Sequence, residues 1–328
     1  MRQPPRMLRV ALLAVAALLG ATVAQAQNEF PNKPIKLVVG YAAGGPTDVI
    51  ARLVGQEIST TLGQPVVVEN RAGANGNIAT EAVARVPADG YTLIVNTLSH
   101  NVNALLQPDK VKYDPVKDFA PISLAVVLPQ LVVVANDAPY KSIDELVKKA
   151  QGKPDSVSYG SAGAGGSAHL AAALLANRSK TQMTHVPFRG NAPALTEVMA
   201  GRVDFMFYPM IGVGDFVTSG KLRILAVTTA KRHPDFPQVP TMAEAGFPGF
   251  EEYVGPVGFL APAGTPPAVL DKLNSAIGAA LAKPALQSRL GGLGAVVMHL
   301  GPAEYRDWLK QDNARWAQLI RAADIKAE

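Results

Sequence analysis

The chain has no cysteine and no cluster of basic residues. Without cysteine it can form neither a disulfide framework nor a thiolate zinc site, and it offers no cysteine for lipid attachment. Of its 31 basic residues, Arg2, Arg6 and Arg9 lie within the first 26 residues, which leaves 28 basic against 26 acidic residues in the remainder. The longest basic groups are pairs such as Lys148–Lys149. We therefore expect no nucleic acid partner.

Long apolar runs are also missing, except at the N-terminus. The run from Val10 to Ala24 is about 15 residues long, whereas a membrane span needs about 20. It follows the three arginines and ends at Ala24-Gln25-Ala26, a small-residue cleavage pattern. We interpret residues 1–26 as a cleaved bacterial signal peptide and expect a mature protein in the periplasm, without a lipid anchor. The 302 residues that remain of 328 suggest two domains.

Strand-like and helix-like segments alternate along the mature chain, which is typical of an α/β fold with mostly parallel sheets. Strands are predicted at 35–41, 66–69, 91–97, 157–161, 184–188, 203–208 and 223–229, and helices at 46–62, 77–86, 142–151, 167–178, 192–201, 266–282 and 302–322. The β-rich runs 122–135, broken at Pro129, and 253–261 can carry the chain between two domains. We predict one domain from 27–127 plus 253–328, a second from 128–252, and a two-strand hinge.

Two glycine-rich turns precede predicted helices. In "GYAAGGPTDVIAR" the spacing predicts Gly45 as N-cap, Pro46 at the first helical position and Asp48 at the third, where its carboxylate can accept from the N–H of the cap. Such a turn can cradle an anion at the positive helix end, or it can use glycine only for its positive φ. In "SYGSAGAGGSAHLAAALL" the expected N-cap is Ser167. Since ligands of open α/β sheets bind beyond the carboxyl ends of the strands, the two turns could hold one anion between the domains.

Three further loops follow strands at the same predicted edge. They offer neutral hydrogen-bonding groups and one arginine, whose guanidinium is a natural partner for a carboxylate. The predicted ligand-binding residues are Tyr41, Ala43, Gly44, Gly45, Thr47, Asp48, Thr97, Ser99, His100, Asn101, Ser161, Gly163, Gly165, Gly166, Ser167, His169, Arg189, Asn191, Tyr208 and Pro209.

Sequence patterns of nucleotide-binding and metal-dependent enzymes are absent. There is no G-x-x-x-x-G-K-[ST], no G-x-G-x-x-G and no H-E-x-x-H, and the five histidines are scattered. We expect no cofactor, no metal and no catalysis. A secreted serine hydrolase built on Ser161 or Ser167 with His169 stays open as an alternative, although neither serine lies in a G-x-S-x-G elbow.

Seven motifs in a fixed order resemble a known family. They are "GYAAGGPTDVIAR", "VENRAGANGNIATEAVARVPADGYTL", "SYGSAGAGGSAHLAAALL", "HVPFRGNAPALTEVMAGRVDFMF", "GKLRILAVTT", "VPTMAEAGFPGF" and "GFLAPAGTPPAVLDKLNSAI", and they cover nearly all of the mature chain. They are similar to the substrate-binding receptors of tripartite tricarboxylate transporters, the Bug family. The resemblance implies a type II periplasmic-binding-protein (Venus-flytrap) fold, a ligand in the interdomain cleft and delivery to a membrane permease.

The resemblance also implies how the loops act. In the family, the turn matching Tyr41–Asp48 contacts one end of the ligand, and the turn matching Ser161–His169 holds a carboxylate at a helix N-terminus. This chain departs from the family's pattern at Tyr41, where Phe is common, at Ala74 and Asn75, in a glycine-rich turn, and at Arg189, where Lys is frequent. The expected ligand is a small mono-, di- or tricarboxylate, including aromatic acids. We expect a monomer, and a sensor that serves a signalling partner is a further alternative.

Overall fold

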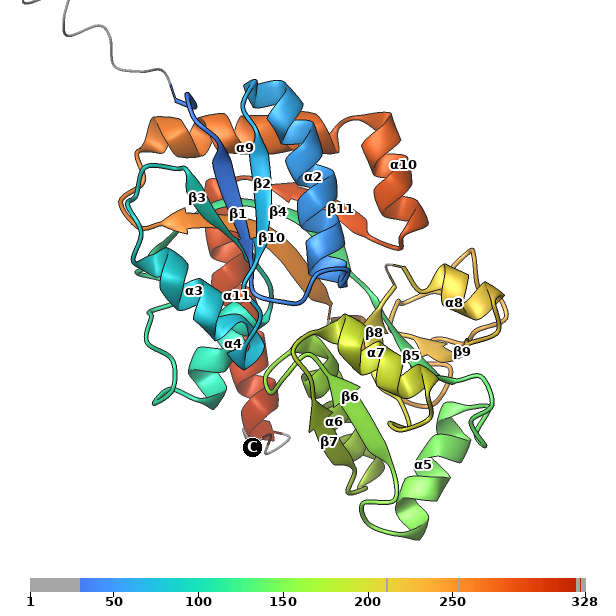
Figure 1. The fold of residues 1–328 in the computed structure, drawn as a ribbon. Coiled ribbons are helices and arrows are strands. Elements are labelled where there is room, and N and C mark those ends of the chain that lie inside the picture. The colour runs from blue at the N-terminus through green and yellow to red at the C-terminus, as the bar shows by residue number, and fades with distance from the viewer. Residues whose placement is uncertain (1–29, 211, 253, 323–324, 326–328) are drawn as a thin grey trace, which may run out of the picture.

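The computed structural model describes residues 30–210, 212–252, 254–322 and 325. The expected signal peptide therefore lies outside the described residues. Figure 1 shows two groups of strands, each flanked by helices, with the blue and orange-red segments of the chain forming one group and the green and yellow segments the other. The protein is α/β, as predicted.

A six-stranded sheet forms the first group. Its order is β11-β4-β10-β3-β1-β2, with bounds β1 Ile35–Val39, β2 Val66–Asn70, β3 Thr92–Asn96, β4 Phe119–Leu128, β10 Gly255–Pro262 and β11 Val296–Leu300. Strand β1 is parallel to β2 and β3, whereas β10 is antiparallel to β3 and β4, and β11 is antiparallel to β4.

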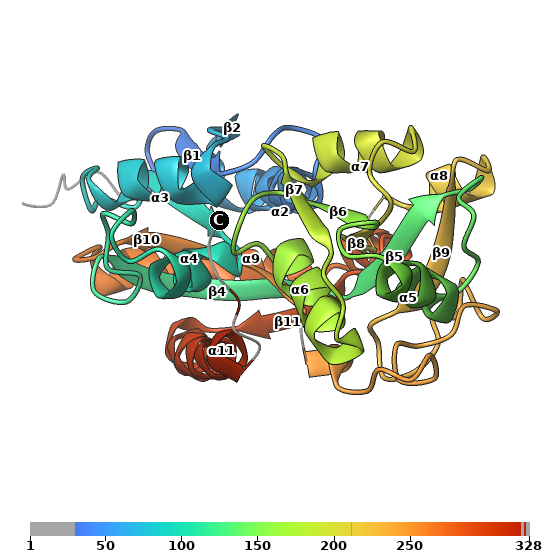
Figure 2. The ribbon, with the colours of Figure 1, turned by 90° about the horizontal axis from the view of Figure 1, so that it is seen from below.

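Helices cover both faces of this sheet. Successive side chains of β1 alternate between the faces: Leu37 and Val39 pack with α2 (Pro46–Leu62) and α9 (Pro267–Leu281), and Val38 packs with α3 (Asn77–Ala84) and α11 (Pro302–Ala322). Figure 2 shows α11 beneath the sheet in that view. The remaining helical elements of this group are η1 (Ala74–Gly76), α4 (Ser99–Leu106) and α10 (Pro284–Gly292).

The second group consists of a three-stranded sheet, β8-β5-β9, and a parallel pair, β6-β7. A bridge between Tyr159 and Phe205 joins the pair to the residues just before β8. The strands are β5 Gln130–Ala135, β6 Ser158–Ser161, β7 Thr184–Pro187, β8 Met206–Pro209 and β9 Leu222–Val227; the helices are α5 Ile143–Gly152, α6 Ser167–Ser179, α7 Asn191–Met199, α8 Gly214–Thr218 and η2 Phe250–Glu252.

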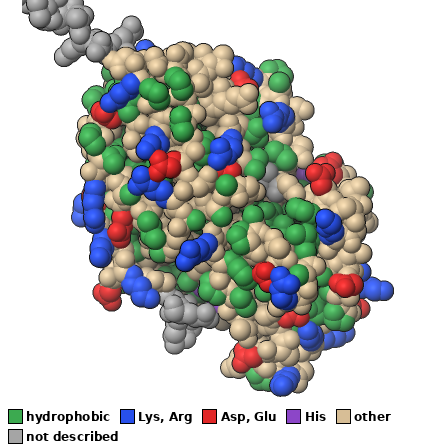
Figure 3. Space-filling model, in the orientation of Figure 1, with side chains coloured by type: hydrophobic (Ala, Val, Ile, Leu, Met, Phe, Trp, Pro, Cys, Tyr) green, Lys and Arg blue, Asp and Glu red, His purple; other side chains and the backbone are tan. Residues whose placement is uncertain are grey.

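The chain passes between the two groups at adjacent places. It leaves β4 at Leu128, crosses through Pro129 into β5, and returns into β10, where Gly255 pairs with Leu128. Because these crossing strands run antiparallel to their neighbours, the six-stranded sheet is mixed and the sheet β8-β5-β9 is antiparallel, so the expectation of mostly parallel sheets was wrong. Among the described residues, no helix combines the length and the apolar character that a membrane crossing needs. Acidic and basic side chains are interspersed over the face shown in Figure 3.

Candidate ligand-binding site

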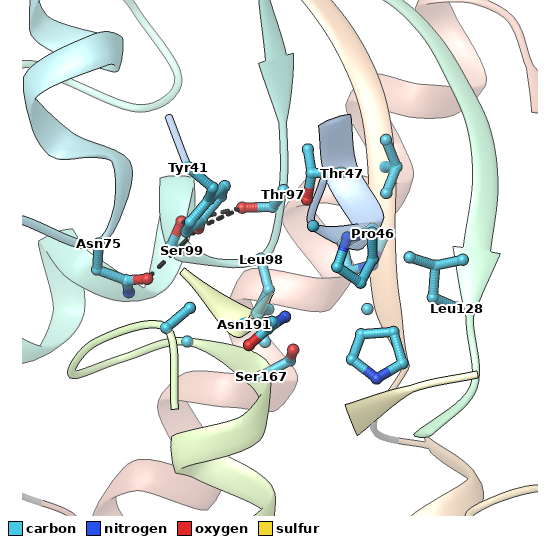
Figure 4. A pocket seen from close by; sticks show the side chains of 17 residues that line it. Tyr41, Pro46, Thr47, Asn75, Thr97, Leu98, Ser99, Leu128, Ser167 and Asn191 are labelled. Atoms are coloured by element: carbon cyan, nitrogen blue, oxygen red, sulfur yellow. Dashed lines mark hydrogen bonds between the residues drawn. The ribbon is translucent and has the colours of Figure 1, made fainter. Parts of the chain in front are cut away.

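A cavity lies where the two groups of strands meet, beside the crossing strands. It is partly open to solvent, and both groups of strands contribute to its lining. Figure 4 shows its lining side chains. The lining residues are Tyr41, Gly45, Pro46, Thr47, Asn75, Thr97, Leu98, Ser99, Leu128, Ala162, Gly166, Ser167, Asn191, Pro209, Gly255, Pro256 and Val257.

The turn between β1 and α2 supplies one wall of the cavity. Gly45 is the N-cap of α2 and Pro46 is its first residue, as predicted, and Gly44 has a φ of 79° that favours glycine. Asp48 accepts from the N–H of Gly44, at 2.9 Å, rather than from the N–H of Gly45 as expected. This bond holds the turn in shape, while Gly45 and Thr47 face the cavity.

The glycine turn before α6 supplies the opposite wall. Its N-cap is Gly166, not Ser167 as expected, because Gly166 takes the extended conformation and Ser167 begins the helix. The hydroxyl-bearing side chain of Ser167 is thereby left to face the cavity (Figure 4). Ser161 is fully buried behind the turn, where its Oγ accepts from the N–H of Gly163, at 3.0 Å, and lies 2.6 Å from Nε2 of His185.

Four helices point their N-termini at the cavity. Lining residues lie at the start of α2 (Gly45, Pro46, Thr47), α4 (Leu98, Ser99), α6 (Gly166, Ser167) and α7 (Asn191). The positive end of each helix dipole favours negative charge there. The first turns of α2, α6 and α7 also present N–H groups without a partner in their own helix, whereas at α4 the N–H groups of His100 and Asn101 already donate to the carbonyls of Thr97 and Leu98. None of the 17 described residues that line the cavity is acidic, so no side chain of the lining opposes an anion.

Polar side chains gather on one side of the cavity. The hydroxyl of Tyr41 lies 2.9 Å from Oγ1 of Thr97 and 2.5 Å from Oγ of Ser99, and we call these three residues the tyrosine cluster. Burial raises the pKa of Tyr41, so its hydroxyl stays protonated and able to donate. Among the described residues, Oδ1 of Asn191 is buried without a hydrogen-bond partner, so it can accept from a hydroxyl or a protonated carboxyl of a ligand, whereas a carboxylate would need Nδ2 of the same amide as its donor.

The side toward the crossing strands is apolar. Leu128 ends β4, Pro209 ends β8, and Pro256 and Val257 belong to β10; we call these four residues the hinge wall. In Figure 4 the side chain of Leu128 lies across the cavity from the tyrosine cluster. The cavity therefore has a polar side and an apolar side.

The predicted site residues divide into two sets. Those that line the cavity are Tyr41, Gly45, Thr47, Thr97, Ser99, Gly166, Ser167, Asn191 and Pro209. Those that do not line it are Ala43, Gly44, Asp48, His100, Asn101, Ser161, Gly163, Gly165, His169, Arg189 and Tyr208. Contact of any of them with a ligand stays a prediction.

Several residues of the second set contact other parts of the protein instead of the cavity. Nδ1 of His169 accepts from the N–H of Gly165, at 3.0 Å, and burial beside His185 lowers the pKa of His169 to about 3. Burial likewise lowers the pKa of His100 to about 4, and its Nε2 lies 2.8 Å from the carbonyl oxygen of Pro115. Arg189 is exposed and lines a separate outer groove.

Eight of the lining residues were not among the predicted ligand-binding residues. They are Pro46, Asn75, Leu98, Leu128, Ala162, Gly255, Pro256 and Val257. The predicted crossings near Pro129 and at 253–261 were a signal for the hinge wall, because residues at a crossing lie beside any cleft between the domains. The glycine-rich turn around Asn75 was the corresponding signal for that residue.

A cavity between two α/β units, reached by several helix N-termini, is typical of a solute-binding protein. The family model "Tripartite tricarboxylate transporter family receptor" matches residues 50–325. The chain belongs to this family, whose members are substrate-binding receptors. The resemblance drawn from the seven motifs is thereby confirmed.

Individual relatives agree over nearly the full length. A protein encoded in the tcbD-tcbE intergenic region of Pseudomonas sp. strain P51 is 40% identical over 309 residues, which cover 94% of this chain and 91% of that protein. The structure of MatC from Rhodopseudomonas palustris with bound malate is 35% identical with a TM-score of 0.84, covering 89% of this chain and 100% of that one. A second R. palustris structure, with adipate, is 34% identical with a TM-score of 0.87, covering 92% and 100%. The binding-protein fold is confirmed.

Proposed function

We propose that this protein is the periplasmic receptor of a tripartite tricarboxylate transporter and that it captures a small organic carboxylate in the cavity. The observation that carries the proposal is the meeting of four helix N-termini at a cavity without an acidic side chain in its lining. Helix N-termini attract anions through free N–H groups and the helix dipole. Malate and adipate, bound by the two R. palustris relatives, are carboxylates, which supports the same ligand class here.

The two sides of the cavity suggest how such a ligand lies. A carboxylate would take hydrogen bonds from Ser167, Asn191 and the N–H groups of α6 and α7, with the tyrosine cluster within the same polar side. The carbon body would lie against the hinge wall, because apolar atoms gain free energy when they leave water for an apolar surface. A small acid with an apolar body fits both sides.

We further propose a first domain of residues 27–127 plus 253–328, a second domain of residues 128–252, and a signal peptide at residues 1–26. The proposed partner is the permease of the transporter, and the receptor delivers its ligand to the permease as a monomer. The protein performs no chemistry. Complete burial of Ser161 and its absence from the cavity lining argue against a hydrolase built on that serine.

A thermal-shift screen tests the ligand class. The mature protein is heated with C4 to C6 dicarboxylates, citrate, glutamate, nicotinate, benzoate and terephthalate, each with its neutral amide as control. An acid present at 100 times its Kd stabilises the native state by about 2.7 kcal/mol, which gives a measurable rise in melting temperature. Ser167→Asp, which adds a negative charge at the cavity, should abolish the shift. A screen in which only neutral compounds raise the melting temperature would overturn the proposal.

A further inference from the structure

Asn75 has a backbone conformation that usually belongs to glycine. It lies in η1 with φ 48° and ψ 42°, the left-handed region, which most side chains avoid but Asn tolerates. The turn thus carries a polar side chain at a position whose backbone conformation glycine would satisfy without one. The contacts of that side chain show what it adds.

The amide of Asn75 joins the two groups of strands. Its Nδ2 donates to the carbonyl oxygen of Ala164, in the turn before α6, at 2.7 Å, and to Oδ1 of Asn103 at 3.0 Å. Its Oδ1 accepts from the hydroxyl of Tyr41 at 3.4 Å. The turn before α6 fits closely around it, because a Cβ added to Gly163 would lie 3.0 Å from Cβ of Asn75.

A buried polar network fixes Asn75 on its own side. Nδ2 of Asn103 donates to the backbone carbonyl of Asn75 at 3.1 Å and to Oδ1 of Asn77 at 2.7 Å. The hydroxyl of Tyr113 donates to the same oxygen of Asn77 at 3.1 Å. Asn75 is thus held from the first group of strands before it reaches Ala164 in the second, and little side-chain freedom is left to lose when that bond forms.

Asn75 also stands between two spaces. It lines the cavity together with Tyr41 and Ala162, and the same three residues line an outer groove whose rim includes Lys110 and Arg189. In Figure 4 the side chain of Asn75 lies at the edge of the cavity and is bonded to Tyr41. Ala164, which accepts from Asn75, also lines the groove.

We propose that Asn75 is a latch, a positioning residue whose bond to Ala164 holds the cleft closed and retains the ligand. The retention of a ligand by this latch rests on the proposed function. Closure of the cleft does not rest on it, because the bond between Asn75 and Ala164 forms without a ligand. The latch therefore favours the closed form of the ligand-free protein as well. Through Tyr41 it is connected to the tyrosine cluster that lines the cavity.

Asn75→Gly removes the latch without backbone strain, because glycine takes a left-handed φ freely. It also removes the bonds of Asn75 to Asn103 and Tyr41. A matched control is Lys180→Gly, which makes the same kind of change at an exposed residue with φ 54° at the end of α6. Since the chain has no cysteine, Lys117→Cys and Gln182→Cys place one spin label on each side of the cleft without further changes. Distances between the labels are measured without ligand in the parent, in Asn75→Gly and in Lys180→Gly.

The latch predicts that Asn75→Gly shifts the distance distribution toward the open form, whereas Lys180→Gly leaves it unchanged. Distributions that are identical in all three proteins would overturn the latch. Of the bonds that Asn75→Gly removes, the bond to Ala164 is the one that joins the two groups of strands. With malate and adipate as probes, its loss should speed dissociation about threefold to tenfold and leave association within about twofold. An unchanged dissociation rate would overturn ligand retention. If the parent binds no acid in the thermal screen, the proposed function fails, while the label distances still decide the latch.

Discussion

Asp48 holds the turn between β1 and α2 from inside the protein. Its carboxylate accepts from the N–H of Gly44 and from Nδ2 of Asn70, both at 2.9 Å, and from Nε of Arg52 at 3.0 Å. Burial raises the pKa of Asp48, but the hydrogen bonds from Arg52, Gly44 and Asn70 outweigh burial and bring the pKa below its usual value. Asp48 therefore shapes the cavity wall without facing the cavity.

Replacing Asp48 by Ala should reduce stability before affinity. The N–H of Gly44 and the amide of Asn70 would each lose a hydrogen bond to a carboxylate, which costs about 2–3 kcal/mol in the free energy of unfolding, measured by urea denaturation. Because the folded pKa is lowered, this stabilisation is present above the usual pKa of about 4 and is lost as the pH falls through the folded value. The difference between parent and variant should therefore shrink at acid pH.

The control for this variant is Asp144→Ala. Asp144 also lies in the first turn of a helix, α5, but its side chain is exposed. It forms a surface ion pair with Lys148. Its loss should cost no more than about 1 kcal/mol. A large loss of ligand affinity in Asp48→Ala with an unchanged melting temperature would contradict the structural role of Asp48.

The roles of single residues were predictable from the sequence where they depend only on neighbouring residues in the chain. Gly45, Pro46 and the acidic residue at the third position of α2 follow from local capping rules. Asn75 and Leu128 were not predictable in this way, because their places in the cavity depend on which strands pair and how the turn before α6 approaches η1. Such contacts join residues far apart in the chain, and no local spacing encodes them.

Helices and strands with strong apolar patterning were predicted most closely. The predicted helix 46–62 coincides with α2, and the strand and helix alternation of both groups is present. Residues 96–103 were interpreted as a polar loop after a strand, but Ser99–Leu106 form α4, whose Ser and Asn side chains are buried in hydrogen-bond networks rather than solvated. Strand β11 was missed because it is a short antiparallel edge strand whose Val296 and Met298 are exposed.

Helix α11 contains a buried acid with a raised pKa. Asp312 accepts from Nε1 of Trp316 at 3.1 Å and pairs with Arg315. Burial raises its pKa to about 6, and the attraction of Arg315 and the bond from Trp316 offset this only in part. Because the folded pKa lies above the unfolded one, the stabilising contribution of Asp312 is full below about pH 4 and is lost as the pH rises through about 6.

Asp312→Asn should therefore gain stability relative to the parent as the pH rises from about 4 to about 6. The gain is about 3 kcal/mol for a shift of about two pKa units. Urea denaturation at pH 4, 5, 6 and 7 measures it. Asp307→Asn, on the same helix but exposed, should show no such trend. A stability difference between Asp312→Asn and the parent that is constant with pH would show that Asp312 does not titrate in this range.

The two groups of strands share buried apolar side chains. Tyr305, near the start of α11, packs in the core of the six-stranded sheet with Ile94 and Leu124. Trp316, farther along the same helix, belongs instead to the core of the second group, with residues such as Phe205 and Leu170. Helix α11 was assigned to the first domain from the sequence, yet its second half is buried in the core of the other group. One helix thus links both cores.

This sharing leads to a prediction about how the protein unfolds. Trp316→Ala should lower the free energy of unfolding by about 3–5 kcal/mol, because it empties a site in which Trp316 is only 1% exposed. Since α11 contributes to both cores, we expect both groups of strands to unfold together at a lower midpoint of denaturation.

Two signals measure the unfolding of the two groups. In Trp316→Ala the only tryptophan that remains is Trp308, which packs against the core of the six-stranded sheet, so its fluorescence reports on that sheet. Far-ultraviolet circular dichroism reports on both groups. Coincident transitions would support a shared core. A fluorescence transition that stays at the midpoint measured for the parent, while part of the dichroism is lost earlier, would show that the two groups unfold independently.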